Sequence, residues 1–241
     1  NFTASAERLR QVCQMMIEED FPFTWSSFAR PDAITGETAA LMGQSGCDFL
    51  EMGIESGNEG MLRRMGKGFG IDTVKRAIDH LNGHGIDVSG AFILGYPGEG
   101  EETIQQTIDF INQSGLSYYR LNFFYYSGSM LLYRERGKHG MAGLGWAWKH
   151  NTMDAAKASA FYGHILANVT GAVTDGLTST WETYKLLRGE GYPREAIYEL
   201  FTLNNELNRL RLKRSHGWDP HSGEVDGILK RFEALIGTTS S

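Results

Sequence analysis

The sequence has few cysteines, few prolines and no long apolar run. Its 241 residues include only 2 cysteines, Cys13 and Cys47, and 5 prolines. Two cysteines far apart in sequence give neither a disulfide framework nor a zinc pattern, and they cannot form a site that needs three thiolates. Both lie in predicted buried elements, which favours inert core thiols over nucleophiles.

The apolar residues are dispersed along the chain. No run approaches about 18 residues, the length that would cross a membrane. No charged-plus-hydrophobic leader precedes the first predicted helix. We therefore expect a cytoplasmic protein without a membrane partner.

The charge balance is mildly acidic, with a formal net charge of -6. Most of the 23 lysines and arginines are scattered, so the sequence does not favour nucleic acid as a partner. Hydrophobic residues make up 41% of the chain, which is enough for a sizeable core.

Helices and strands alternate over the first half of the chain. Strands are predicted at 21–30, 47–54, 88–94 and 117–126. Helices are predicted at 4–20, 35–44, 58–65, 72–82 and 100–113. A helix, a Ser-Gly or His-Gly pair and then a strand recur at Gly46, Gly85 and Gly115. This repeating unit predicts parallel, adjacent strands joined by right-handed crossovers.

Beyond Gly128 the pattern becomes helical. Helices are predicted at 152–169, 181–187, 193–212 and 225–236. The predicted fold class is α/β: a partial TIM-barrel-like (β/α) parallel sheet over residues 1–128, followed by an α-helical extension over 129–241. Four strands are too few to close a barrel. We therefore expect its edges to be covered by other sequence, by the helical extension or by self-association with another copy.

Polar residues mark the inside of the predicted sheet. Period-2 alternation places Glu51 and Glu55 on the barrel side of their strand. Glu51 either pairs with Arg30 or another buried cation, or has a catalytic role. Arg30, Arg120 and Asn122 are expected at the pocket floor or on the substrate side.

A second candidate region is GLGWAWKHNTMD, at 143–154. Its Trp148 and His150 are candidates for a substrate-facing lid or a cofactor contact. The alternative is that His150 is a hydrogen-bonded packing residue beside tryptophan. Tyr125 is equally open between a pocket role and packing.

Three pieces of sequence carry a family resemblance. They are GIESGNE at 53–59, RMGKG at 64–68 and FILGYPGE at 92–99. Together with ARPD at 29–32, they resemble the latter half of the radical S-adenosylmethionine (SAM) fold, and most of all the members that also bind cobalamin. The pieces occur in the family's order and spacing, over about the first half of the chain.

The resemblance implies a SAM pocket. By their positions in the motifs, the residues it assigns to SAM are Glu55, Ser56, Arg64, Lys67, Phe92, Leu94, Gly95 and Pro97. Glu55 and Ser56 match contacts to the ribose and amino-acid portion. Lys67, with Arg64 as its competitor, matches a contact to the SAM carboxylate. Phe92, Leu94 and Gly95 match the strand that holds adenine.

The chain departs from the family at its cluster motif. The family holds a [4Fe-4S] cluster with three cysteines spaced CxxxCxxC, and this chain has no such motif. We therefore expect no metal ligand here and assign no catalytic residue. We expect a fragment, inactive alone, whose cluster loop lies upstream of Asn1.

The implied function is that of a radical SAM enzyme. Such enzymes cleave SAM reductively to a 5′-deoxyadenosyl radical that abstracts hydrogen, and many cobalamin-dependent members then methylate an unactivated carbon. The substrate class left open is a small molecule or a peptide. The alternatives are a non-catalytic binding module on a degenerate barrel and, less favoured by scattered candidates, a metal-free barrel hydrolase or aldolase.

Overall fold

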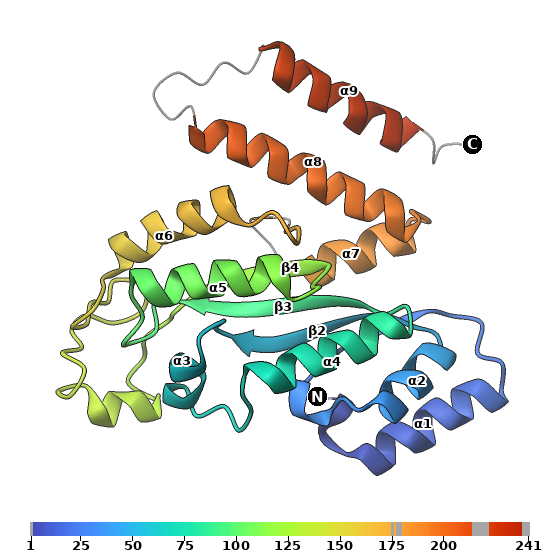
Figure 1. The fold of residues 1–241 in the computed structure, drawn as a ribbon, viewed down its shortest axis with the longest axis horizontal. Coiled ribbons are helices and arrows are strands. Elements are labelled where there is room, and N and C mark those ends of the chain that lie inside the picture. The colour runs from blue at the N-terminus through green and yellow to red at the C-terminus, as the bar shows by residue number, and fades with distance from the viewer. Residues whose placement is uncertain (1, 175, 177–179, 214–221, 238–241) are drawn as a thin grey trace.

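One parallel sheet organises the molecule. Figure 1 shows the computed structural model, which describes residues 2–174, 176, 180–213 and 222–237. The strands lie in the order β1-β2-β3-β4, and all neighbours are parallel. Their bounds are β1 (Trp25–Ala29), β2 (Cys47–Glu55), β3 (Asp87–Leu94) and β4 (Tyr118–Phe123). The predicted α/β class and strand adjacency are confirmed.

Helices connect the strands and continue after them. Before β4 these are η1 (Phe2–Ala4), α1 (Ala6–Glu18), η2 (Pro31–Ala33), α2 (Gly36–Gln44), α3 (Glu59–Arg64), α4 (Ile71–Gly83) and α5 (Glu101–Gln113). After β4 they are η3 (Leu131–Glu135), α6 (Ala155–Asn168), α7 (Thr180–Gly189), α8 (Arg194–Lys213) and α9 (Gly223–Gly237). The predicted helical C-terminal region is therefore present.

Local sequence signals explain where most helices begin. The side chain of Ser5 accepts a hydrogen bond from the Arg8 N–H at the start of α1. Asn58 does the same for the Met61 N–H at the start of α3. Asp72, predicted at the start of the fourth helix, does not cap it: the N-cap is Gly70, α4 begins at Ile71, and Asp72 lies in its first turn.

The outer face of the sheet builds the main core. Leu50, Met52 and Ile54 of β2 are fully buried on this face. Helices α2, α4 and α5 lie along it in Figure 1, and Val74, Ile78 and Ile108 of these helices belong to the same cluster. The period-2 alternation predicted for β2 is thus confirmed, because its apolar set faces the helices.

The opposite, inner face is divided along the strands. At its N-terminal end, Phe49 of β2 and Tyr118 of β4 pack with Tyr184, Ile197 and Phe201 from α7 and α8. Two residues further along the same strands, Glu51 and Arg120 line a pocket. Helices α7 and α8 therefore cover the inner face at the N-terminal ends of the strands and leave the part nearer the C-terminal ends uncovered.

The sheet edges differ in their cover. Beside β4, the Tyr119 N–H donates to the Val173 carbonyl at 2.9 Å. Beside β1, Trp181 of α7 donates to the Ser26 hydroxyl at 3.1 Å. The first strand is shorter than predicted: it begins at Trp25, and Phe23 is 64% exposed instead of packed. Self-association through the β1 edge remains a proposal.

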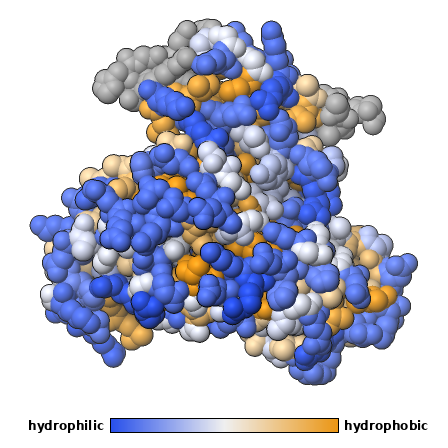
Figure 2. All heavy atoms as spheres, viewed as in Figure 1, coloured by the Kyte–Doolittle hydropathy of each residue, from blue (hydrophilic) through white to orange (hydrophobic). Residues whose placement is uncertain are grey.

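The helical part joins the sheet closely. Ala158 and Ile165 of α6 belong to the same hydrophobic cluster as the strands, so the change of architecture near residue 128 does not separate two cores. The division into two domains at that residue stays a prediction. Figure 2 shows a mostly hydrophilic surface on this face, with hydrophobic areas near α8 and α9. Within the described ranges, no helix is long and apolar enough to cross a membrane.

Candidate functional site

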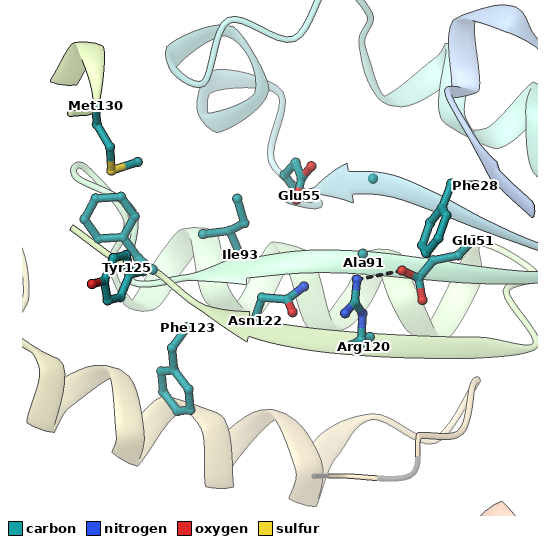
Figure 3. Close-up of a pocket in the computed structure, with 12 residues that line it drawn as sticks. Phe28, Glu51, Glu55, Ala91, Ile93, Arg120, Asn122, Phe123, Tyr125 and Met130 are labelled. Carbon is teal, nitrogen blue, oxygen red and sulfur yellow. Dashed lines mark hydrogen bonds and ion pairs between the residues drawn. The ribbon is translucent and has the colours of Figure 1, made fainter. Parts of the chain in front are cut away.

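A groove runs over the free part of the inner face. Its volume is about 390 Å³, and all four strands contribute to it. The residues that line it are Phe28, Glu51, Gly53, Glu55, Ala91, Ile93, Arg120, Asn122, Phe123, Phe124, Tyr125 and Met130. Figure 3 shows a charged end at Glu51 and Arg120, and Tyr125 and Met130 at the other end. The C-terminal ends of parallel strands are where ligands of such sheets bind.

The charged end is a buried ion pair. Glu51 Oε1 lies 2.6 Å from Arg120 Nη2, and the Glu51 side chain is 1% exposed. The prediction that Glu51 pairs with Arg30 is wrong, because Arg30 pairs with Asp32 at 2.8 Å. The alternative, that it pairs with another cation, is confirmed. The Arg120 Nε is buried and has no hydrogen-bond partner in the described part of the chain. The pair therefore gives the groove floor fixed charges of both signs.

The middle of the groove contains an unusual backbone conformation. Glu55 has φ +75°, one of the few non-glycine residues in the left-handed region, and the β2–β3 register shifts just before it. Its carboxylate lies 2.7 Å from Lys67 Nζ, which also lies 3.3 Å from the Gly53 carbonyl oxygen. Such backbone strain concentrates at functional sites. Through these two contacts of Lys67, the RMGKG segment is attached to the end of β2.

The turn after β3 is held by two buried titratable side chains. Gly95 has φ +94°, and its N–H donates to Glu99 Oε2 at 2.5 Å. The His150 Nε2 lies 3.0 Å from the Gly95 carbonyl oxygen. Burial raises the pKa of Glu99 to about 7 and lowers the pKa of His150. Both backbone groups of Gly95 therefore have protein partners.

Several residues assigned to SAM do not face the groove. The side chains of Phe92 and Leu94 are each 1% exposed within the outer-face core, so apolar contact to adenine from these side chains is wrong. Ala91 and Ile93 line the groove instead. Ser56 is fully buried, with its hydroxyl 3.4 Å from that of Thr107 on α5.

The turn residues and the small residues of β3 also have packing roles. Pro97 is buried within the Gly95 turn. A side chain at Gly90 would place Cβ 2.9 Å from Ile54 Cδ1, so the lack of bulk there serves close packing on the outer face. Arg64 lines a separate pocket of about 460 Å³ with Tyr96 and His139. The structure thus separates Arg64 from its competitor Lys67.

The predicted lid residues lie behind the groove. Trp148 is 3% and His150 8% exposed, so their expected place on the pocket surface is wrong. Tyr125 does line the groove, is 49% exposed and contacts the Trp146 ring edge-to-face at 4.9 Å. Arg30 does not line the groove, and its guanidinium lies 5.6 Å from the Phe69 ring centroid.

Three residues of the site were not predicted from the sequence: Ile93 and Met130, which line the groove, and Glu99, which holds the Gly95 turn. Alternation along β3 from Ala91 would have found Ile93, because the two side chains share one face. Glu99 is the last residue of FILGYPGE, and its carboxylate reaches back to the Gly95 N–H four residues earlier. No local pattern marks Met130.

Metal ligands are not gathered in this structure. The described residues contain no group of three or more His, Cys, Asp or Glu side chains that could hold a metal ion. Cys13 and Cys47 are 0% and 4% exposed in the core, where burial raises the pKa of both thiols. The two thiols therefore do not fit an iron–sulfur cluster.

Comparison with known proteins gives the same fold. The archaeal Elp3 of Methanocaldococcus infernus superposes with a TM-score of 0.52 and 16% identity over 79% of this chain and 52% of that chain. The apo form of OxsB, a cobalamin-dependent SAM radical enzyme, gives a TM-score of 0.50 and 13% identity over 98% of this chain and 49% of that chain. At sequence identities this low, the superpositions show a similar fold and nothing about function.

Curated relatives match shorter stretches. The bacteriochlorophyllide d C-12(1)-methyltransferase of Chlorobaculum tepidum is 35% identical over 83 residues, 34% of this chain and 18% of the relative. The tRNA-2-methylthio-N(6)-dimethylallyladenosine synthase of Deinococcus radiodurans is 32% identical over 139 residues, 56% of this chain and 25% of the relative. The chain thus spans a quarter or less of the length of these two relatives.

The family model matches the region that holds the first three strands of the sheet. Residues 3–111 match the model described as the radical SAM superfamily. This stretch contains β1, β2 and β3, and with them the Glu55–Lys67 pair and the Gly95 turn. Residues 3–111 thus match the radical SAM superfamily.

Proposed function

We propose that this chain forms the SAM-binding portion of a radical SAM enzyme that transfers a methyl group to an unactivated carbon. The observation that carries the proposal is the pair of Glu55, which lines the groove on a strained backbone, with Lys67 at 2.7 Å. A polar pair fixed at the C-terminal end of a barrel strand is the expected place for cofactor binding.

The groove residues divide the binding task. The Glu55 carboxylate accepts hydrogen bonds from ribose hydroxyls or an ammonium group. Lys67 orients Glu55 and offers a cation to the SAM carboxylate. Ala91 and Ile93 give an apolar wall for adenine, and Asn122, whose amide lies 3.5 Å from the Phe92 carbonyl oxygen, gives that wall a polar edge.

In this superfamily, SAM reduced by an iron–sulfur cluster supplies a 5′-deoxyadenosyl radical. The described residues of this chain do not fit the cluster, so no step here runs through it. What the chain's own residues do is bind SAM, orient it over the inner face and exclude water below it, where Phe49 and Tyr118 close the half-barrel. Methyl transfer is proposed because relatives of this chain are named methyltransferases. Cobalamin binding stays a prediction.

The test is SAM binding to the purified chain, measured by calorimetry. The unchanged chain binds SAM, and Lys67→Met weakens binding about 10-fold, because a hydrogen bond to a charged group is lost. Arg64→Met is the matched control, since Arg64 lies in the other pocket. Equal loss in both variants, or no binding by the unchanged chain, would contradict the proposal.

A second candidate function is a SAM-binding module without catalysis. The observation that favours it is the lack of a third cysteine anywhere in the 241 residues. The two functions differ in turnover: the complete encoded polypeptide, reduced with dithionite in the absence of oxygen, releases 5′-deoxyadenosine from SAM if it is an enzyme. A module binds SAM and leaves it intact. The substrate, a small molecule or a peptide, is a further part of the proposal.

A further inference from the structure

A short segment after η3 holds the ends of two strands together. His150 donates from Nε2 to the Gly95 carbonyl at 3.0 Å, just past β3. Trp148 stacks on the His150 ring, with centroids 5.2 Å apart and 2° between the ring planes. The Trp148 indole N–H donates to the Phe124 carbonyl at 2.7 Å, just past β4. One stacked pair of rings is thus hydrogen-bonded to the backbone just past both β3 and β4.

The hydrogen bonds of His150 fix its tautomer. A carbonyl oxygen only accepts, so Nε2 carries the proton that reaches Gly95. In the neutral ring Nδ1 is then an acceptor, and it lies 3.3 Å from the Thr152 N–H and 3.1 Å from the Thr152 hydroxyl. That hydroxyl also accepts from the Gly98 N–H at 3.2 Å. Burial lowers the pKa of His150, which favours the same neutral ring.

These contacts reach the groove directly. Phe124, just past β4, and Ile93 of β3 both line it. The Phe124 N–H donates to the Leu94 carbonyl at 2.8 Å, so both backbone groups of Phe124 are bound, one by β3 and one by Trp148. A side chain at Gly95 would lie 2.6 Å from Trp148 Cζ2, which shows how closely the rings cover this turn. The groove wall therefore depends on the segment behind it.

We propose that His150 and Trp148 are positioning residues for SAM, which set the spacing of the β3 and β4 ends that form the adenine side of the groove. The inference rests on the proposed function. It adds that residues beyond 3–111, outside the match to the family model, control SAM affinity without touching SAM.

The experiment compares SAM dissociation constants for the unchanged chain, His150→Ala, His150→Gln and His164→Gln. His150→Ala weakens SAM binding about 3- to 10-fold, the loss of one hydrogen bond that orders the site. His150→Gln keeps an N–H donor of similar reach and stays within about 2-fold of the unchanged chain. His164 is exposed on α6 and its variant serves as the control. All titrations use protein shown to be folded by circular dichroism.

A spectroscopic measurement tests the geometry separately. Two-bond proton–nitrogen spectra of histidine-labelled chain at pH 7.5 show His150 as a neutral ring protonated at Nε2. Thr152→Val removes the hydroxyl that Nδ1 accepts from and shifts the His150 signals. This measurement holds even where His150→Ala fails to fold.

The outcomes separate the two proposals. SAM that binds equally well to the unchanged chain and to folded His150→Ala overturns the positioning role and leaves the proposed function standing. A ring protonated at Nδ1 also overturns it. No SAM binding by the unchanged chain overturns the proposed function and this inference with it.

Discussion

Glu51 on β2 and Arg120 on β4 form an ion pair across the intervening strand β3, with 2.6 Å between Oε1 and Nη2. The carboxylate is almost fully buried and the guanidinium is 27% exposed. Arg120→Met takes away the cation beside a buried anion. We expect it to lower the free energy of unfolding by about 2 kcal/mol, less than fully buried pairs lose, because Arg120 is partly hydrated.

Urea unfolding followed by circular dichroism measures this change. The double variant Glu51→Leu/Arg120→Met recovers most of the loss, since apolar replacement of both partners removes the buried charge. Arg10→Met, which breaks the exposed Arg10–Glu37 pair, is the control and leaves the midpoint unchanged. A double variant no more stable than Arg120→Met would refute this account of the pair.

Glu99 predicts how stability depends on pH. Its folded pKa of about 7 lies above the ordinary value for glutamate, because burial opposes ionisation. In the unfolded chain Glu99 ionises from about pH 4.3 upward, while the folded chain keeps it protonated until about pH 7. Its contribution to stability is therefore full at low pH and is lost as pH rises through this window, by roughly 2–4 kcal/mol.

The measurement is urea unfolding between pH 5 and pH 8 for the unchanged chain and for Glu99→Gln. The variant cannot ionise at this position, so the difference in stability between variant and unchanged chain grows in favour of Glu99→Gln as pH rises. Glu101→Gln, at an exposed side chain in the first turn of α5, is the control. Parallel pH profiles for the unchanged chain and Glu99→Gln would show that Glu99 ionises normally in the folded state.

The cysteines predict the outcome of cluster reconstitution. Cys13 and Cys47 are buried, and two thiols fall short of the three that the family's cluster requires. Incubation of this chain with iron and sulfide, without oxygen, leaves it without the visible absorption and the paramagnetic signal of a [4Fe-4S] cluster. The unchanged chain and the Cys13→Ala/Cys47→Ala variant are expected to contain the same trace amount of iron after this treatment. Stoichiometric iron in the unchanged chain and none in the variant would contradict the prediction.

The sequence predicted those features of the site that follow from a local period. Alternation placed Glu51 and Glu55 on the inner face. The glycine at each helix end marked where the next strand begins. Gly46, Gly85 and Gly115 all have positive φ, the conformation that ends a helix. The family resemblance assigned Phe92 and Leu94 to adenine, but their side chains lie in the core on the outer face. The residues of β3 that line the groove are their neighbours Ala91 and Ile93, because side chains alternate along a strand.

The remaining features depend on contacts between distant residues. Arg120 lies 69 positions from Glu51, and His150 lies 55 positions from Gly95. Both pairings are set by strand register and by the path of the chain after η3, which no local pattern encodes. The positive φ of Glu55 is equally hidden, since most glutamates avoid that region and only the surrounding bulge imposes it.

Gly95 offers the sharpest test of the packing around the turn, because a matched glycine exists elsewhere. Gly95→Ala meets two obstacles: a backbone at φ +94° and a Cβ 2.6 Å from Trp148 Cζ2. We expect a loss of about 3 kcal/mol, from backbone strain and overpacking together. Gly66 has φ +71° but nothing within 4 Å of an added Cβ, so Gly66→Ala loses only about 1 kcal/mol.

Urea unfolding of both variants separates the two causes. Trp148→Leu in the Gly95→Ala background makes room for the methyl group, so the double variant loses less than the sum of its two single losses, with a coupling of about 1 kcal/mol or more. Equal losses at Gly95 and Gly66 would show that Trp148 does not pack against the turn. The positioning role of the 148–152 segment would then lose its structural basis.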